Sequence, residues 1–389
     1  MALKDNIISE SDIGNLFELL NEYAKGKNLK YKYLSNRWSD FQQWRIMARS
    51  KVFELLNYFP TDVPLDASVL KKIERNDYIQ EEIEFNTALS IRVRGSILIP
   101  KMDQERYPAI IAIHDHGAFY YYGREKVIEM DDEPSALTKF KRVAYGGKSY
   151  ANDLVKRGYV VLCIDGFYFG TRRLDIERVS KEMFGVVTGW SLKGLEPGTE
   201  EYINTYNLIC KDFEMLVVKH ILASGTTWPG ILLHDDRKCI DYLFTRKEVD
   251  VNRIACCGLS IGGYRAAFLA ALDDRIKAAV VTGWMPTFYS LLYNRLRHHT
   301  YMCYIPNLTS FMELSDVMAL AAPKFLFIQQ CAKDHLFDYG GMVDACREIA
   351  EVYKKIGLSE KYKYEFYEND HEFNLKMQND AFRWLDTVL

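Results

Sequence analysis

The chain has 389 residues, of which 48% are hydrophobic and 26% charged, a balance typical of globular proteins rather than of disordered or membrane chains. The net charge of -3 gives no reason to expect a nucleic-acid partner. We find no run of eighteen apolar residues, and acidic residues interrupt the N-terminus before any signal-like apolar core, so the sequence predicts a cytoplasmic protein with no membrane partner.

The first 65 residues are predicted to form a helical extension. Apolar residues within 13–20 share one helical face, and residues 38–56 carry a second amphipathic pattern. A proline-containing stretch at 57–64 then breaks the pattern. We expect this arm to cover the edge of the core or to join a second subunit in a homo-oligomer.

Residues 66–389 are predicted to form a catalytic domain of the α/β class. An antiparallel pair is expected at 78–85 and 89–100, with a turn at Asn86-Thr87. Apolar runs and helical stretches then alternate, which indicates a mostly parallel central sheet with helices on both faces. The candidate strands are residues 109–113, 160–164, 253–257, 277–282, 324–329 and 363–367. The candidate helices are residues 149–157, 234–246, the segment after residue 260, 342–356 and 379–388.

Two intervals, residues 172–229 and 284–315, are longer than simple crossovers between strands. We expect these roofing intervals to cover a site above the sheet and to carry its specificity. Phe119, Tyr120 and Trp284 are candidates for lining the substrate pocket, and ordinary packing is the alternative for them.

Two adjacent arginines, Arg172 and Arg173, open the first roofing interval. They are candidates for recognising an acidic substrate, and salt bridges to Asp175 or Glu177 are the structural alternative. The eight cysteines lack CxxC spacing and several lie in apolar runs, so we expect buried free thiols rather than zinc ligands or disulfides.

The most informative stretch is Gly258-Leu259-Ser260-Ile261-Gly262, which fits the G-x-S-x-G nucleophile elbow. In such an elbow a strand turns sharply into a helix and presents the serine hydroxyl at the turn. A short apolar run precedes the motif at 252–257, and helix-forming residues follow it at 264–272. This context predicts that Ser260 is a catalytic nucleophile.

A serine nucleophile needs an imidazole base, and the imidazole needs a carboxylate that fixes its tautomer. Asp334 follows one predicted strand and His371 follows the last one, so both fall at the sheet edge where Ser260 is expected. Asp338 is an alternative acid, but it lies further from its strand. His335 is an alternative base, but it directly follows the proposed acid, whereas the expected chain order is serine, acid, histidine.

Backbone amides usually stabilise the oxyanion of the acyl transition state. The amide of Ile261, next after the nucleophile, is one candidate. The second candidate is the amide of His116 or Gly117, in the loop after an earlier strand.

The pair His114 and His116 also supports a metal hypothesis, because alternate strand residues point to one side and can chelate zinc. His220, His234, His298 and His299 are the other histidines available to complete the shell. None has a recognisable ligand spacing, and a metal site leaves the elbow unexplained.

Together, His114-Asp115-His116-Gly117, the elbow, Asp334 and His371 resemble the α/β-hydrolase superfamily over residues 78–389. Within it, the chain resembles the bacterial dienelactone-hydrolase-like and acetyl-xylan-esterase-like group, whose members have an N-terminal helical extension. The passages that carry this finer resemblance are residues 111–117 with Arg124-Glu125-Lys126, 258–265, and 304–308 before 322–328.

The resemblance implies a triad of Ser260, Asp334 and His371, with Ile261 and the His116 region as the oxyanion hole. Dienelactone hydrolase itself uses a cysteine nucleophile, so the serine here favours ester over lactone hydrolysis. We therefore expect a cofactor-free esterase acting on a small acyl, acetyl-like ester of a carbohydrate or another small molecule. A peptidase or thioesterase with the same triad is the nearest alternative.

Overall fold

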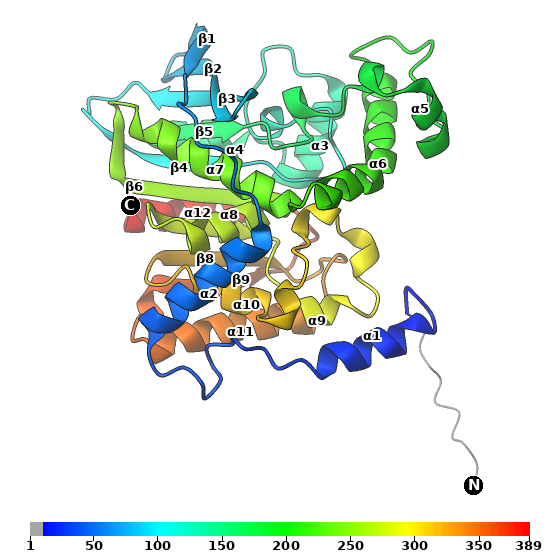
Figure 1. Ribbon diagram of the computed structural model, residues 1–389. Helices are drawn as coiled ribbons and strands as arrows, with labels where there is room; N and C mark the ends of the chain where they lie inside the picture. Colours follow the sequence, from blue (N-terminus) through cyan, green and yellow to red (C-terminus); the bar gives the residue numbers. More distant parts are fainter. Residues whose placement is uncertain (1–10) are drawn as a thin grey trace.

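A computed structural model describes residues 11–389, and a nine-stranded sheet runs through its centre (Figure 1). The strand order is β1-β2-β3-β5-β4-β6-β7-β8-β9. The first three strands and the β3–β5 pair are antiparallel, and all pairs from β5 to β9 are parallel. The strands are β1 Ser68–Glu74, β2 Tyr78–Ala88, β3 Ile91–Pro100, β4 Tyr107–Ile113, β5 Val160–Ile164, β6 Val249–Leu259, β7 Ile276–Thr282, β8 Phe325–Cys331 and β9 Tyr362–Tyr367.

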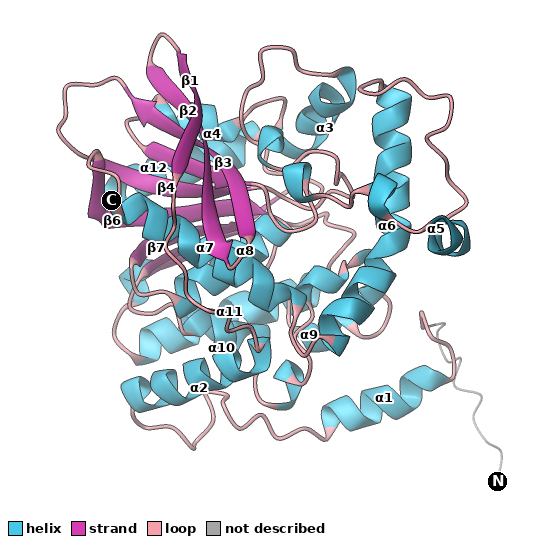
Figure 2. Ribbon diagram, turned by 45° about the horizontal axis from the view of Figure 1, so that its top comes forward, coloured by secondary structure: helices cyan, strands magenta, loops and turns pink. Residues whose placement is uncertain are grey.

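Helices cover both faces of this sheet (Figure 2). They are α1 Leu16–Lys25, α2 Phe41–Leu56, α3 Ser135–Tyr145, α4 Tyr150–Val155, α5 Lys181–Val187, α6 Glu200–Ala223, α7 Trp228–Phe244, α8 Ile261–Leu272, α9 Phe288–Leu291, α10 Leu314–Ala319, α11 Tyr339–Lys355 and α12 Leu375–Val388. The mostly parallel α/β architecture expected from the sequence is confirmed.

The continuous apolar runs of the central strands have a simple packing reason. In β4, Ile111 and Ile113 join the core that contains residues of α2, α7, α8, α10 and α11. Their neighbours Ile110 and Ala112 join the opposite core, with residues of α3, α4 and α12. Because successive side chains point to opposite faces, a strand covered on both sides must be apolar throughout.

Two local predictions were wrong. The turn expected at Asn86-Thr87 lies inside β2, because the Asn86 side chain and amide bond to the carbonyls of Pro64 and Leu65. The chain reverses instead near Ser90, which has a positive φ of 60°. The edge strand β1 was missed because its side chains are almost all exposed and do not alternate.

The N-terminal extension contains the two expected helices, and its first ten residues lie outside the described part. Helix α2 buries Trp44, Ala48, Val52 and Leu56 in the core. Helix α1 lies at the lower right edge of the molecule in Figure 1 and buries none of its residues.

Within residues 11–389, no single helix is long and apolar enough to cross a membrane. Helices α6 and α7 together would meet the length and composition criteria, but they bend by 83° at the break between them. All eight cysteines are buried and free, as the sequence predicted.

Candidate active site

Ser260 lies at the sharp turn between β6 and α8, with φ 59° and ψ -123°. The flanking glycines are needed for steric reasons. A Cβ on Gly258 would lie 2.5 Å from the backbone of Gly262, and a Cβ on Gly262 would lie 2.5 Å from the Ile113 carbonyl oxygen. The expected elbow therefore forms, and it holds Ser260 in a strained conformation that the surrounding backbone enforces.

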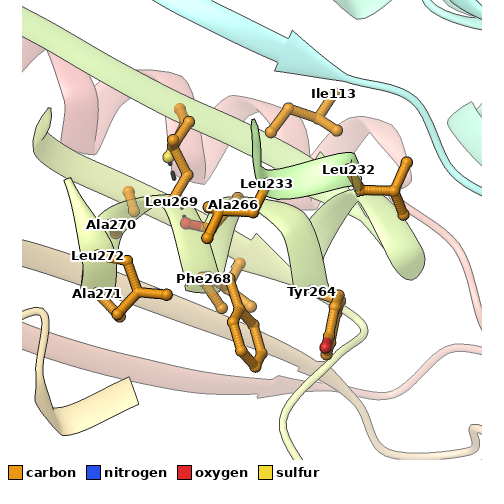
Figure 3. Close-up of a cluster of buried hydrophobic side chains, with 14 of the residues drawn as sticks. Ile113, Leu232, Leu233, Tyr264, Ala266, Phe268, Leu269, Ala270, Ala271 and Leu272 are labelled. Atoms are coloured by element: carbon orange, nitrogen blue, oxygen red, sulfur yellow. Dashed lines mark hydrogen bonds between the residues drawn. The ribbon is translucent and has the colours of Figure 1, made fainter. Parts of the chain in front are cut away.

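The helix that follows Ser260 is fixed firmly in the core. Every residue of α8 is buried, and Figure 3 shows its side chains beside Leu232 and Leu233 of α7 and Ile113 of β4. Such dense packing leaves the helix little freedom to move. The position of Ser260 is thus set by the core of the protein.

Asp334 and His371 come from the loops after β8 and β9, and the structure brings them together. Asp334 Oδ2 lies 2.5 Å from His371 Nδ1, and Asp334 Oδ1 accepts a 2.9 Å hydrogen bond from the Leu336 amide. The Asp334 side chain is fully buried. His371 Nε2 is buried and has no hydrogen-bond partner among residues 11–389.

The end of β7 links this pair to the elbow. The Thr282 carbonyl accepts a 2.9 Å hydrogen bond from the Ser260 amide. The next residue, Gly283, backs the His371 ring, since a Cβ there would lie 3.2 Å from His371 Cε1. Two consecutive residues therefore contact the serine and the histidine.

Asp338, the alternative acid, and His335, the alternative base, lie outside the Asp334–His371 pair. Asp338 caps α11 by accepting a 2.8 Å hydrogen bond from the Gly341 amide. His335 is exposed, and its ring lies 5.8 Å from that of His298. Neither residue contacts the Asp334–His371 pair through a hydrogen bond in the described part of the chain.

A cavity of about 1320 Å³ opens above Ser260. Both roofing intervals contribute to its wall, as expected. The predicted site residues that line it are His116, Gly117, Phe119, Tyr120, Ser260, Ile261, Trp284 and His371. Further lining residues include Lys139, Glu200, Lys211, Glu214, Arg297, His298, Thr300 and Tyr301. A mixture of aromatic and polar side chains in one concave site is typical of small-molecule binding.

Comparison with solved structures identifies the architecture. A "putative acetyl xylan esterase" from Bacteroides fragilis superposes with a TM-score of 0.69 at 18% identity, covering 92% of this chain and 84% of that one. A glucuronoyl esterase from Solibacter usitatus gives a TM-score of 0.59 at 13% identity, covering 90% and 94%. The chain has the α/β-hydrolase fold.

In sequence, the chain is 25% identical over 346 residues to "Putative hydrolase YtaP" of Bacillus subtilis (strain 168). The match covers 89% of this chain and 100% of the relative. No protein-family model matches the chain.

The candidate oxyanion amides belong to Ile261 and to the loop after β4, both of which line the cavity. Ile261 is the first residue of α8, so its amide has no acceptor within the helix. Gly117 has φ 53°, and a Cβ there would lie 2.4 Å from the Phe140 ring. The Ala118 amide is not available, since it donates to His116 Nδ1 at 3.0 Å.

The His116 ring is held by a buried carboxylate in the first roofing interval. Its Nε2 lies 3.0 Å from Glu214 Oε1, and because Nδ1 accepts from Ala118, Nε2 must carry the proton. Tyr120 also donates to Glu214 Oε1. Burial would raise the Glu214 pKa, but the hydrogen bond from His116, helped by those from the Thr300 and Tyr120 hydroxyls, lowers it overall.

The ring nitrogens of the two proposed metal ligands have protein partners. His114 is fully buried, with Nδ1 bonded to the Asp115 carbonyl and Nε2 accepting from the Gly166 amide. The His116 nitrogens are engaged as described above. Burial also lowers the pKa of His114 well below its ordinary value. Among the described residues, no group of three or more potential ligands gathers at one point.

Among residues 11–389, neither of the two arginines that open the first roofing interval forms the salt bridge to Asp175 or Glu177 that was the alternative to substrate recognition. Arg172 pairs with Asp235 of α7 at 2.6 Å. Arg173 donates to the Gly170 carbonyl and lies over the Tyr121 ring. Both arginines therefore have partners in the protein framework.

Two residues of this region were missed by the sequence reasoning. Lys126 reads as one member of a charged, solvent-facing triplet, yet it is fully buried. Glu214 reads as an ordinary helix residue, yet it is 8% exposed and faces the loop after β4. Neither has a local sequence signal, because their partners are distant in the chain or belong to the backbone.

Proposed function

We propose that this protein is a serine carboxylesterase that works through an acyl-enzyme intermediate. One arrangement carries the proposal: Ser260 at a strained elbow shares a cavity with His371, whose Nδ1 is bonded to Asp334 and whose Nε2 has no partner within residues 11–389. An unpaired, buried imidazole nitrogen is suited to accept the proton of a serine hydroxyl.

The reaction then follows from the roles of these groups. His371 Nε2 takes the proton of Ser260 as its oxygen attacks the ester carbonyl carbon. Asp334 stabilises the resulting imidazolium, and the amides of Ile261 and of His116 or Gly117 stabilise the oxyanion. His371 gives the proton to the departing alcohol oxygen, and water then releases the acyl group by the same steps.

We propose a small acyl, acetyl-like ester of a carbohydrate or another small molecule as the substrate. The aromatic walls provided by Phe119, Tyr120 and Trp284, next to polar groups, support an alcohol portion of considerable size. The esterases named among the structural neighbours act on carbohydrate-linked esters by their names, which supports the same class. Cytoplasmic residence stays a prediction from the sequence.

Organophosphonate labelling provides the main test of the proposal. We expect a p-nitrophenyl alkylphosphonate to abolish p-nitrophenyl acetate hydrolysis and to add its mass to Ser260. The Ser260→Ala variant should resist labelling and lose most activity. Wild-type hydrolysis by this variant would contradict the proposal.

The alternatives are separated by substrate and by metal content. Matched ester, thioester and amide substrates with the same acyl group distinguish an esterase from a thioesterase or peptidase. For the metal hypothesis through His114 and His116, we expect full activity after exhaustive chelation, because both rings already bond to protein groups. Loss of activity restored by zinc would favour the metal-dependent hydrolase.

A further inference from the structure

We propose that Lys126 is a positioning residue of the oxyanion hole, whose ammonium group orients two of its candidate backbone amides. The inference rests on the proposed function of Ser260. Lys126 is the last residue of η1 (Arg124–Lys126), a short 3-10 helix in the segment between β4 and α3.

The ammonium group of Lys126 is bound entirely by the protein interior. The side chain is 0% exposed, and its Nζ donates to the carbonyl of Asp115 at 2.8 Å and to that of His116 at 2.9 Å. The same nitrogen lies 4.6 Å from the ring centroid of Phe169 and 5.3 Å from that of Phe140. A cation over aromatic faces is favourable when it is shielded from water.

The consequence for the oxyanion hole follows from the planarity of the peptide bond. In a trans peptide the C=O and the next residue's N–H point in opposite directions. The Asp115 carbonyl is directed at Lys126, so the His116 amide is directed away from it. The His116 carbonyl is also directed at Lys126, and so the Gly117 amide is directed away as well.

These two amides are the ones that the loop can offer to substrate. His116 and Gly117 both line the cavity, and neither amide donates to a protein acceptor in the chain from residue 11 onward. One buried ammonium thus binds two consecutive peptide carbonyls, and it acts together with His114 Nδ1 on the first and the Phe119 amide on the second. Its positive charge also polarises both amides toward a negative charge in the cavity, which preorganises the site for the transition state.

Several charged groups face Lys126 and set its protonation. Burial lowers its pKa to about 8, while the carboxylates of Asp115, Glu125 and Asp165 favour the charged form and Arg265 opposes it. The neighbouring His114 stays neutral, because its burial and the Lys126 charge both lower its pKa. Lys126 is therefore charged at neutral pH and loses its charge above about pH 8.

The second-order rate constant for phosphonylation of Ser260 tests the inference. In this step the serine oxygen displaces p-nitrophenolate from an alkylphosphonate, and the phosphoryl oxygen occupies the oxyanion position. For Lys126→Met we expect labelling to slow about hundredfold or more, which is the typical effect of losing an oxyanion donor.

Lys324→Met is a matched control. Lys324 is also buried, its pKa is also lowered to about 8 by burial, and its Nζ donates to the carbonyls of Ala270 and Asp273. It does not line the cavity. This variant should unfold at a lower temperature but label within threefold of the wild-type rate.

The outcomes separate the inference from the proposed function. An unlabelled Ser260 in the wild-type protein would refute the proposed function itself. Labelling of Ser260 at equal rates in wild type and Lys126→Met would refute the role of Lys126 alone. If Lys126→Met does not fold, the labelling rate of Lys126→Gln decides. We expect it to fall at least tenfold, because the shorter side chain cannot reach both carbonyls as the lysine does, and a rate within threefold of wild type would overturn the inference.

Discussion

Glu214 and Thr300 join the two roofing intervals above the cavity, through a 2.6 Å hydrogen bond from the threonine hydroxyl to Glu214 Oε1. The same oxygen also accepts hydrogen bonds from His116 Nε2 and from the Tyr120 hydroxyl. The first roofing interval, the second one and the loop after β4 are therefore tied at one buried carboxylate. The shape of the cavity and the position of its candidate oxyanion donors are coupled through Glu214.

The charge of Glu214 should be visible in the pH dependence of stability. Its pKa is lowered below the ordinary 4.5 in the folded protein, so the unfolded chain takes up the proton first as pH falls. The stabilisation is fully present above pH 4.5 and is lost as pH falls through the folded-state pKa. We expect Glu214→Gln to cost about 2 kcal/mol at pH 7, and this difference should shrink below pH 4.5.

Urea unfolding at several pH values measures this difference. Glu201→Gln is a suitable control, because Glu201 lies on the same helix and is exposed. The control should change stability little at any pH. A cost for Glu214→Gln that is equal at pH 7 and pH 4 would contradict the assignment.

Replacing the acid of the proposed triad tests its role directly. In Asp334→Asn, an amide that donates a hydrogen bond can favour the wrong His371 tautomer. We expect kcat for p-nitrophenyl acetate to fall by about 10⁴-fold with little change in fold. Asp338→Ala should instead lose a helix cap, at about 1 kcal/mol, and keep its kcat. The reverse pattern would identify Asp338 as the acid.

Gly283 offers a way to displace His371 without changing any polar group. A Cβ at Gly283 would lie 3.1 Å from Leu259 Cδ1 and 3.2 Å from His371 Cε1, and its φ is 57°. Gly357 has a similar φ of 73° with no atom within 4 Å of such a Cβ. Alanine at either position should cost about 1 kcal/mol from backbone strain.

Activity should separate these two glycine variants. We expect kcat to fall tenfold or more in Gly283→Ala, because small displacements of a reacting group are costly, and to stay unchanged in Gly357→Ala. Steady-state kinetics and thermal unfolding of both variants check this. Equal activity in the two variants would show that the contact does not position His371.

Much of the sheet was predictable because a strand covered on both faces must be apolar throughout. β5 was located at its observed bounds for this reason, as all five of its residues are buried. The elbow was predictable because backbone contacts leave no room for a Cβ at Gly258 or Gly262. The pairing of Asp334 and His371 followed from strand order, since parallel strands end at the same edge.

The remaining features depend on contacts that sequence spacing does not encode. Asn86 favours a turn by composition, but carbonyls of the preceding linker satisfy it inside β2. Arg172 pairs with a residue on another helix rather than with its near neighbours. Lys126 can be buried because backbone carbonyls and aromatic rings replace the water molecules that would otherwise solvate its ammonium group. The run of charged residues in the sequence does not indicate these contacts.

The homo-oligomer through the N-terminal arm stays a prediction, and α1 gives it a defined test. Leu16, Leu19 and Tyr23 are 59%, 72% and 69% exposed on this helix, while Phe17 packs edge-on against Tyr293 of the body. Apolar residues on the outer face of an amphipathic helix are typical of an interaction surface.

We expect light scattering to find a multimer that Leu19→Glu converts to a monomer. Val186→Glu, at a similarly exposed valine on a different helix, α5, should leave the multimer intact. A monomeric wild-type protein would show that this face has no self-association role.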